Sequence, residues 1–457
     1  GAARSSICFQ SPPSDETLQP EAGRSMGIVK YSAITLAILI VVMFMLVGIL
    51  SMTRGATVRT VIAEGDEGGP PQVSDPLFPR SIELFTGTHI EPGNRIEILL
   101  NGEGTYPRLW KDIQSAQKTL TVQLYYSQPG VVADTMAKYL TERARAGVRV
   151  LVLFDAFGSG TLTDEWVEGL EDAGVEVAWL RKVRWYSLHK ATQRSHVRAV
   201  VVDGRVGYTG GFGLADYWLG DGRHKEQWRE TNVRFQGPTV AALQAAFAAG
   251  WAETTGELLT GDLFFPPIAF ETEGSVNAGL MHSLPTIGST PAERFIALSI
   301  AGARKSLYIS NSYFVPNSDF CELLVHAAKR GVDVRILTVS NETDVKTTWH
   351  AGRALYEGLL EGGVKIYEYK PAMMHAKTIV VDGLFGVVGS MNFDNRSIAH
   401  NNEAQIVALD AGVGKQLDEI FLEDLKYSEE IKLETFRQRP WHNKVLEWGA
   451  QKLRRVL

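Results

Sequence analysis

Apolar residues are distributed unevenly along the chain, and their spacing predicts two kinds of segment. The run from Tyr31 to Met52 contains no charged residue and, as a helix, is long enough to cross the hydrocarbon core of a bilayer. We therefore expect a transmembrane helix at 31–52, after an N-terminal tail at 1–30. Beyond residue 83, apolar β-branched runs alternate with amphipathic helical stretches, which is the pattern of a layered α/β fold.

A linker is predicted at 53–82, because Gly65 to Pro76 is acidic and rich in Gly and Pro. Positive charges are balanced across the apolar run, with Arg24 and Lys30 before it and Arg54 and Arg59 after it. The side of the membrane on which the globular part lies therefore stays open.

The globular part contains the same pattern twice. The clearest pair of matching segments is HVRAVVVDGRVGYTGG, which begins at His196, and HAKTIVVDGLFGVVGS, which begins at His375. Three further pairs of segments match in the same order and at a nearly constant spacing: Ile113–Leu120 with Ile300–Leu307, Ala144–Leu153 with Ala328–Leu337, and the stretches that begin at Ala173 and Gly362. An internal duplication explains this order.

From the duplication we expect one body with two pseudo-twofold-related lobes, each a mixed β-sheet flanked by helices. The lobes are predicted at 83–260 and 291–430, with a connection at 261–290. A basic and aromatic tail follows at 431–457.

Each copy of the clearest repeated segment is a predicted strand with a histidine and a cation at its start. Side chains alternate along a strand, so His196 shares a face with Arg198, and His375 shares a face with Lys377. The rest of each strand is apolar on both faces, and such a buried strand does not tolerate a cation without an anionic partner. The simplest partner for both copies is a bound phosphate, for which Arg and Lys are the natural donors.

An aspartate followed by glycine ends each of these strands. Asp203 and Asp382 stand at the same offset from the two histidines, where a turn-stabilising role competes with a chemical one. His196 and Asp203 are seven residues apart and point to opposite faces of a strand, so a metal site is not indicated.

These residues resemble the signature of the phospholipase D superfamily, in which His-x-Lys-x4-Asp occurs twice. Within that superfamily the chain is similar to bacterial cardiolipin synthases from roughly Glu83 to Leu457. The more specific matches are GSMNFDNRS from Gly389, YFVP from Tyr313 and GVKIYEY from Gly363. The resemblance implies two phospholipase D-type lobes and a single-pass protein of the bacterial cell membrane.

The resemblance also implies a phosphatidyltransferase that needs neither metal nor cofactor. One histidine attacks phosphorus to form a covalent phosphatidyl-histidine, and the other protonates the leaving alcohol. By this analogy His196 is the nucleophile and His375 the acid and base, although the symmetry of the sequence does not distinguish them. The complete catalytic set is then His196, Arg198, Asp203, His375, Lys377 and Asp382.

Four further residues are expected to support this set. Glu230 and Glu403 match the acidic position of the family and are assigned to orient the imidazoles, while Ser390 and Asn392 supply neutral donors. The chain departs from the family at two positions, with Arg198 in place of the usual Lys and Gly213 in place of the common Asn. The first half of the site therefore lacks one donor.

The expected substrates are phospholipids at a membrane, with two phosphatidylglycerol molecules giving cardiolipin and glycerol. The stretch from Leu180 to Lys190 and the tail with Trp441 and Trp448 mix cations with aromatic residues, as membrane-interface segments do. For the tail, packing on the body is an equal alternative. A phospholipase D-type hydrolase, a nuclease and a non-catalytic scaffold stay open as alternative functions.

Composition limits the remaining alternatives. The chain has 46 Lys and Arg against 52 Asp and Glu, a net charge of −6, which speaks against a surface built for nucleic acid. Cys8 and Cys321 are too few for a disulfide framework or a cysteine zinc site. No nucleic-acid partner is expected, and the oligomeric state stays open.

Overall fold

The computed structural model describes residues 22–52, 58–63, 70–182, 193–267, 275–286 and 288–454, without the side chains of 22–29 and 47–52. It divides into two compact units, Gly1–Gly55 and Ala56–Leu457. The first contains helix α1 (Ala22–Met52), where the long apolar residues from Tyr31 to Leu46 are exposed.

The transmembrane helix expected at 31–52 is not found. Within the part of the chain that the structure describes, no helix is both long and apolar enough to cross a bilayer. The side chains of the predicted run are described from Tyr31 to Leu46. The rest of the predicted run, 47–52, has side chains outside the described residues.

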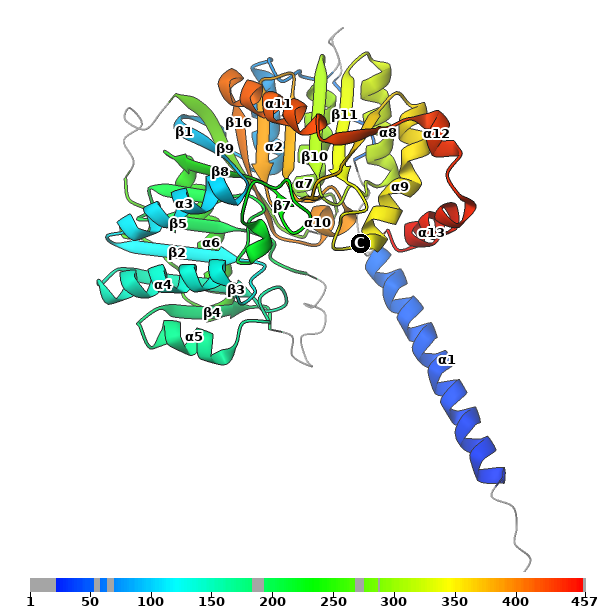
Figure 1. The fold of residues 1–457 in the computed structure, drawn as a ribbon, viewed down its shortest axis with the longest axis horizontal. Helices are drawn as coiled ribbons and strands as arrows, with labels where there is room; N and C mark the ends of the chain where they lie inside the picture. The colour runs from blue at the N-terminus through cyan, green and yellow to red at the C-terminus, as the bar shows by residue number, and fades with distance from the viewer. Residues whose placement is uncertain are drawn as a thin grey trace, which may run out of the picture. The chain divides into compact units, whose positions relative to one another are not determined.

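In the second unit the described strands form one mixed sheet that runs through both lobes (Figure 1). The strands of the first lobe are β1 (Glu91–Leu100), β2 (Thr119–Leu124), β3 (Arg149–Asp155), β4 (Glu176–Leu180), β5 (Ala199–Val202), β6 (Val206–Thr209) and β8 (Thr231–Gln236). Those of the second are β9 (Val276–Ser283), β10 (Ser306–Asn311), β11 (Asp333–Val339), β12 (Lys365–Tyr369), β14 (Lys377–Val381), β15 (Phe385–Gly389), β16 (Glu403–Leu409) and β17 (Ser428–Ile431). A separate two-stranded sheet joins β7 (Trp228–Arg229) to β13 (Met373–Met374).

The order of the strands confirms the internal repeat. Outward from the centre, one lobe has the order β1-β8-β6-β5-β2-β3-β4 and the other has β9-β16-β15-β14-β10-β11-β12, with β17 added at the edge. The two halves meet where β1 and β9 pair antiparallel, with Glu91 opposite Ala278 and Asn94 opposite Val276. An antiparallel central pair is what a twofold relation between the lobes requires.

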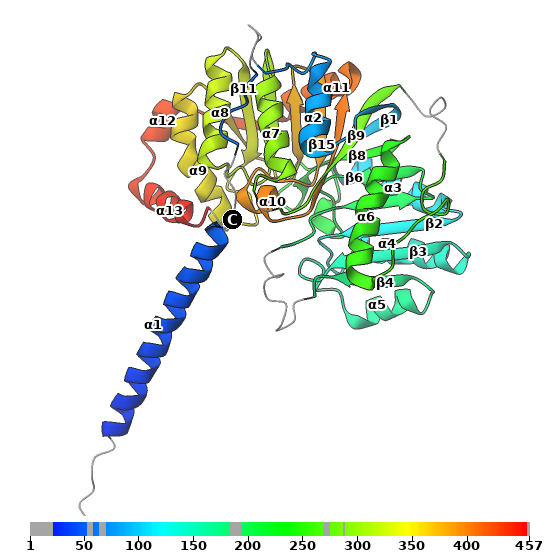
Figure 2. The ribbon, with the colours of Figure 1, turned by 180° about the vertical axis from the view of Figure 1, so that it is seen from behind.

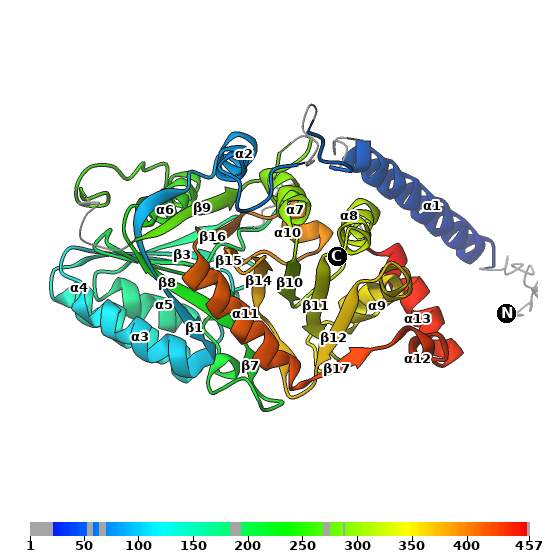
Figure 3. The same cartoon turned by 90° about the horizontal axis from the view of Figure 1, so that it is seen from above.

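Helices flank the sheet (Figures 1, 2 and 3). The first lobe has α3 (Asn101–Ser115), α4 (Val131–Arg145), α5 (Asp164–Glu171), the short η2 (Asp216–Trp218) and α6 (Thr239–Thr255). The second has α7 (Pro291–Gly302), α8 (Ser318–Lys329), α9 (Lys346–Glu361), α10 (Asn395–Ala399) and α11 (Ala411–Leu425), followed by α12 (Leu433–Arg437) and α13 (Trp441–Lys452).

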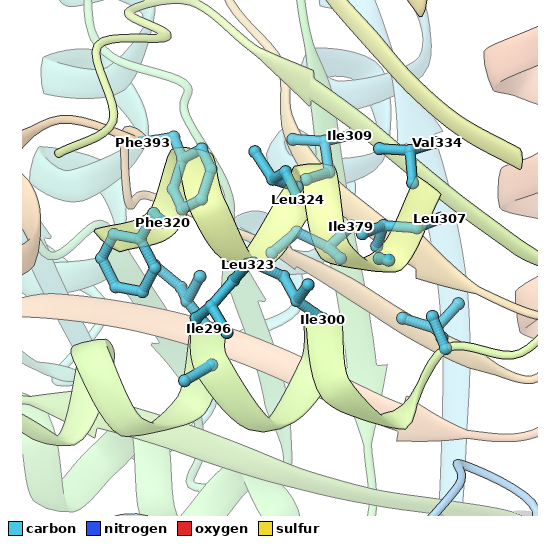
Figure 4. Packing of buried hydrophobic residues seen from close by; sticks show 14 of the residues in the cluster. Ile296, Ile300, Leu307, Ile309, Phe320, Leu323, Leu324, Val334, Ile379 and Phe393 are labelled. Carbon is cyan, nitrogen blue, oxygen red and sulfur yellow. The ribbon is translucent and has the colours of Figure 1, made fainter. Parts of the chain in front are cut away.

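The core of the second lobe shows why its strands read as continuous apolar runs. Ile300 on α7 and Leu323 on α8 pack over the strand residues Leu307 and Ile379 (Figure 4). Every residue of β14 is buried, because helices cover both faces of the sheet.

Two stretches predicted as connections contribute to the folded body instead. Helix α2 (Leu77–Thr86) overlaps the predicted linker and buries Phe78 and Ile82 in the core of the second lobe. These residues are four apart and lie on one helical face. Strand β9 lies in the predicted connection 261–290 and forms the central pair with β1.

Candidate active site

Short backbone connections between the lobes fix the position of each candidate histidine. Strands β7 and β13 pair in parallel, and the His375 N–H donates to the Arg229 carbonyl at 2.7 Å. On the opposite side, the His196 N–H donates to the Asn402 carbonyl at 2.9 Å. The backbone of each histidine is thus hydrogen-bonded to the residue just before a glutamate of the other lobe, Glu230 or Glu403.

The two imidazoles are held by carboxylates in a crossed arrangement. His196 of the first lobe lies 3.1 Å through Nδ1 from Oε2 of Glu403 in the second lobe. His375 of the second lobe lies 2.5 Å through Nδ1 from Oε2 of Glu230 in the first. All four side chains are buried. Because a carboxylate accepts from Nδ1–H, each Nε2 keeps its lone pair.

One cation stands beside each histidine. The Arg198 guanidinium donates to the His196 carbonyl at 2.9 Å and to the Phe212 carbonyl at 3.3 Å. The Lys377 ammonium donates to the Ser312 hydroxyl at 2.7 Å and to the His375 carbonyl. Both cations are almost fully buried, as the apolar strands predict, and they lie in the half-sites where the sequence places them.

Burial keeps both imidazoles neutral in the free site. Desolvation, assisted by the charge of Arg198, lowers the pKa of His196 to about 4, although Glu403 opposes the shift. Desolvation and then the charges of Lys377 and Arg198 hold the pKa of His375 well below its usual value. A neutral imidazole with a free Nε2 is suited to nucleophilic attack.

Two basic and two acidic side chains are buried together at the site. Desolvation lowers the pKa of Lys377 to about 7, with Arg198 adding to the shift. Burial acts to raise the pKa of Glu403, but its contacts with His196 and Ser390 outweigh burial and lower it. Near neutral pH, Arg198 and a partly protonated Lys377 face Glu403 and Glu230, although burial raises the pKa of Glu230. A bound phosphodiester monoanion would leave a buried excess of negative charge. Proton uptake by the site restores the balance.

Ser390 and Asn392 lie at the site but in different roles. The Ser390 hydroxyl donates to Oε2 of Glu403 at 2.5 Å, so it holds the carboxylate that orients His196, whereas we expected a donor to phosphate. Asn392 is buried, and its Oδ1 has no hydrogen-bond partner among the described residues. The unpartnered atom is an acceptor, so it can receive a hydrogen bond from a ligand hydroxyl, whereas only Nδ2 could donate to a phosphate.

The first half of the site replaces both residues with glycine. Gly211, the counterpart of Ser390, lies so close to Glu230 that a Cβ would stand 2.3 Å from its Oε2. At Gly213, the counterpart of Asn392, a Cβ would lie 2.7 Å from both the Trp218 ring and the Tyr126 carbonyl. Trp218 itself donates through Nε1 to Oε2 of Glu230 at 3.4 Å. Gly213 therefore departs from the family pattern because an indole fills the space of a side chain.

The two aspartates expected in the catalytic set bind backbone groups in the structure, which favours the turn-stabilising role for both. The Asp203 carboxylate accepts from the backbone N–H groups of 117, 118 and 119. The Asp382 carboxylate accepts from those of 304, 305 and 306. Both residues have positive φ, 53° and 54°, which Asp tolerates in tight turns. Asp203 follows β5 and anchors the start of β2, and Asp382 follows β14 and anchors the start of β10. Each aspartate lies seven residues after the histidine of its own segment.

Three aromatic side chains at the site were not predicted. The Tyr125 ring meets His196 edge-on with centroids 4.8 Å apart. His375 lies 4.6 Å from Trp228 and 5.5 Å from Trp218 by ring centroids. The position of Trp228, two residues before Glu230, is the one sequence feature that could have indicated its place at the site. Its contact with His375 of the opposite lobe follows only from the pairing of β7 with β13. Among the described residues, no cluster of His, Cys, Asp or Glu could hold a metal ion.

Comparisons with known proteins agree on one family. A family model described as "Cardiolipin synthase, PLD-like domain" matches residues 109–251 and 296–425. The cardiolipin synthase of Geobacillus kaustophilus is 34% identical over 364 residues, which cover 79% of this chain and 72% of that protein. Cardiolipin synthase A of Pseudomonas syringae is 30% identical, with 83% of this chain and 81% of that protein covered.

Among solved structures, the fold resembles that of the phosphatidylserine synthase of Haemophilus influenzae. The TM-score is 0.64 at 12% identity, and the match covers 83% of this chain and 99% of that one. At this identity the likeness concerns the fold alone.

The hydrogen bonds of Asp203 predict a structural role that is separable from chemistry. Asp203→Ala removes a carboxylate that caps three backbone N–H groups, so we expect a loss of about 2–4 kcal/mol in the free energy of unfolding. The Asp203→Ala protein that remains folded should keep the kcat for phospholipid turnover within a few-fold of wild type. His375→Ala should lower the same kcat at least a thousandfold. Denaturant unfolding and kcat at 15 °C measure the two effects. Unchanged stability with a lost kcat would contradict this role.

The charge balance predicts that an anionic ligand binds together with a proton. Above pH 7 the free site holds neutral imidazoles and a Lys377 that loses its proton, because the pKa values of all three groups are lowered. The affinity for a non-cleavable phospholipid phosphonate should therefore fall as pH rises. The decrease should approach tenfold per pH unit, which corresponds to one proton. Calorimetry in buffers of different ionisation enthalpy measures the uptake directly. An affinity that does not change between pH 7 and 9 would contradict proton uptake on binding of the anionic ligand.

Proposed function

This chain belongs to the family of phospholipase D-like cardiolipin synthases, and from that premise we propose that it joins two phosphatidylglycerol molecules into cardiolipin and releases glycerol. The observation that carries the proposal is the pair of crossed His–Glu contacts beside two buried cations. This set supplies a nucleophile, an acid and charge neutralisation for displacement at phosphorus.

In the first step, we assign His196 as the nucleophile on the basis of the family resemblance. Its Nε2 lone pair attacks the phosphorus of one phosphatidylglycerol, and the bond from phosphorus to the glycerol oxygen breaks. His375, protonated when the anionic substrate binds, gives its Nε2 proton to that oxygen. Glycerol leaves, and a phosphatidyl group stays on His196.

In the second step His375 acts as the base and His196 as the leaving group. The neutral Nε2 of His375 takes the proton from a hydroxyl of a second phosphatidylglycerol. The hydroxyl oxygen attacks phosphorus, the bond to Nε2 of His196 breaks, and cardiolipin is released. Glu403 and Glu230 keep each Nδ1 protonated throughout, so the chemistry stays at Nε2.

Stabilisation of the charged intermediate falls to the two cations and one amide. We assign Arg198 and Lys377 to neutralise the non-bridging oxygens and the Nδ2 amide group of Asn392 to add a neutral donor. Because these groups are buried, their hydrogen bonds to the reacting phosphate are stronger than in water. Both substrates are membrane lipids, so we place the reaction at a bacterial membrane.

The products of phosphatidylglycerol turnover test the proposed reaction. Purified protein in detergent with phosphatidylglycerol alone should form cardiolipin and glycerol in equal amounts, as measured by mass spectrometry. His196→Ala and His375→Ala should each reduce turnover at least a thousandfold. Phosphatidic acid as the main product would identify a hydrolase instead, and turnover equal in wild type and both variants would remove the enzyme proposal.

The assignment of His196 as nucleophile predicts a trappable intermediate. In His375→Ala, a phosphatidyl ester of p-nitrophenol still reacts, because that leaving group needs no acid, but the second step lacks its base. The peptide containing His196 should therefore gain one phosphatidyl group. His196→Ala is the matched control and should stay unlabelled. Label on the His375 peptide of that control would reverse the assignment.

A further inference from the structure

Helix α13 presents its apolar side chains outward. Trp441, Val445, Leu446 and Trp448 are 76%, 55%, 52% and 62% exposed. At 100° per residue, Trp441, Val445 and Trp448 lie within about 60° of one another on one side of the helix, whereas Leu446 lies about 100° from Val445 and outside this face. A helix at a protein surface normally turns such a face toward the core.

The inward side of α13 is held by charge. Glu447 is only 1% exposed and forms ion pairs with Arg353 of α9 at 3.4 Å and with Arg439 at 2.8 Å. Arg353 also pairs with Glu368 at the end of the sheet. This buried network fixes the rotation of α13 about its axis, so exposure of its apolar side is built into the fold.

Helix α13 also flanks the catalytic end of its lobe. Ala450 packs against Val315 and Ala351, and Val315 lies three residues after Ser312, which binds the Lys377 ammonium. Figures 1 and 2 show α13 against α9, near α10 at the same end of the body. The helix that carries the apolar face is thus packed against the segment that holds the Lys377 ammonium.

The charges around this face favour an anionic lipid surface over a second copy of the chain. Lys452 lies over the Trp448 ring at 5.2 Å, and Lys444 flanks the same face. Lys444 and Lys452 are the basic residues of α13 and Arg454 follows the helix, while its acidic residue, Glu447, faces inward. Arg437 and Arg439 do not add to this face, because they pair with Glu361 and Glu447. Two such surfaces repel each other, whereas tryptophan beside lysine suits the headgroup region of an anionic bilayer.

We propose that α13 inserts its apolar face into the headgroup region of an anionic membrane and so holds the active site against the lipid surface. The helix lies in the plane of the interface, with Trp441 and Trp448 as anchors. Binding to the membrane does not depend on the proposed function, and only the effect on turnover rests on it.

Hydrogen exchange of the full chain tests the contact locally. Vesicles of phosphatidylglycerol and phosphatidylcholine should slow exchange of the amides in 441–453, while phosphatidylcholine alone should do so much less. Trp441→Ala/Trp448→Ala should abolish this protection. Leu84→Ala/Phe85→Ala, which truncates exposed side chains of α2, is the matched control and should leave it unchanged. Because both pairs are exposed, unchanged Tm should confirm that each variant folds.

Turnover adds a second readout. With phosphatidylglycerol in vesicles, the tryptophan variant should show an apparent KM raised roughly tenfold with an unaltered kcat. With a short-chain monomeric phosphatidylglycerol it should match wild type. Absence of protection by anionic vesicles, while the monomeric substrate is turned over, would overturn this proposal alone. Protection without turnover of either substrate would leave it standing and refute the proposed function. Protection that depends on protein concentration without lipid would assign the face to a second copy.

Discussion

The crossed contacts between imidazole and carboxylate are the constraint on which the rest of the structure depends. Each lobe buries a glutamate whose partner belongs to the other lobe, and a buried carboxylate without a partner costs several kcal/mol. The β1–β9 pair and the backbone bonds at Arg229 and Asn402 bring the partners together. Docking of the lobes and formation of the site are therefore one event.

Within this frame the two half-sites are unequal. Glu403 is held by the Ser390 hydroxyl, whereas Glu230 has the Trp218 indole as its second side-chain partner. One cation is a guanidinium facing the Tyr125 ring at 5.6 Å, and the other is an ammonium bound by Ser312. A phosphate bound between them would contact the planar guanidinium of Arg198 on one side and the compact ammonium of Lys377 on the other. The overall symmetry of the fold thus coexists with chemically distinct environments for the two histidines.

Sequence reasoning was most successful where the repeat itself carried the information. The His196 and His375 segments, their cations and the two-lobed mixed sheet follow from local patterns that occur twice. The partner of each histidine did not follow, because Glu230 and Glu403 are each nearer in sequence to the histidine that they do not contact. Asp203 and Asp382 belong to the repeated signature, yet positive φ and three backbone donors assign them to turns. Helix α2 was hidden by the Gly- and Pro-rich stretch before it, and the span expected at 31–52 was inferred from hydropathy alone.

The antiparallel junction of β1 with β9 makes this chain the covalent equivalent of a homodimer. In a true homodimer every mutation appears in both halves of the shared centre at once, so a change that suits one side must also be tolerated by the other. A single polypeptide that carries both halves is released from that coupling. Trp218 could therefore fill the space beside Gly213 in one half while the other half kept Asn392. A substitution in one half required no matching substitution in the other.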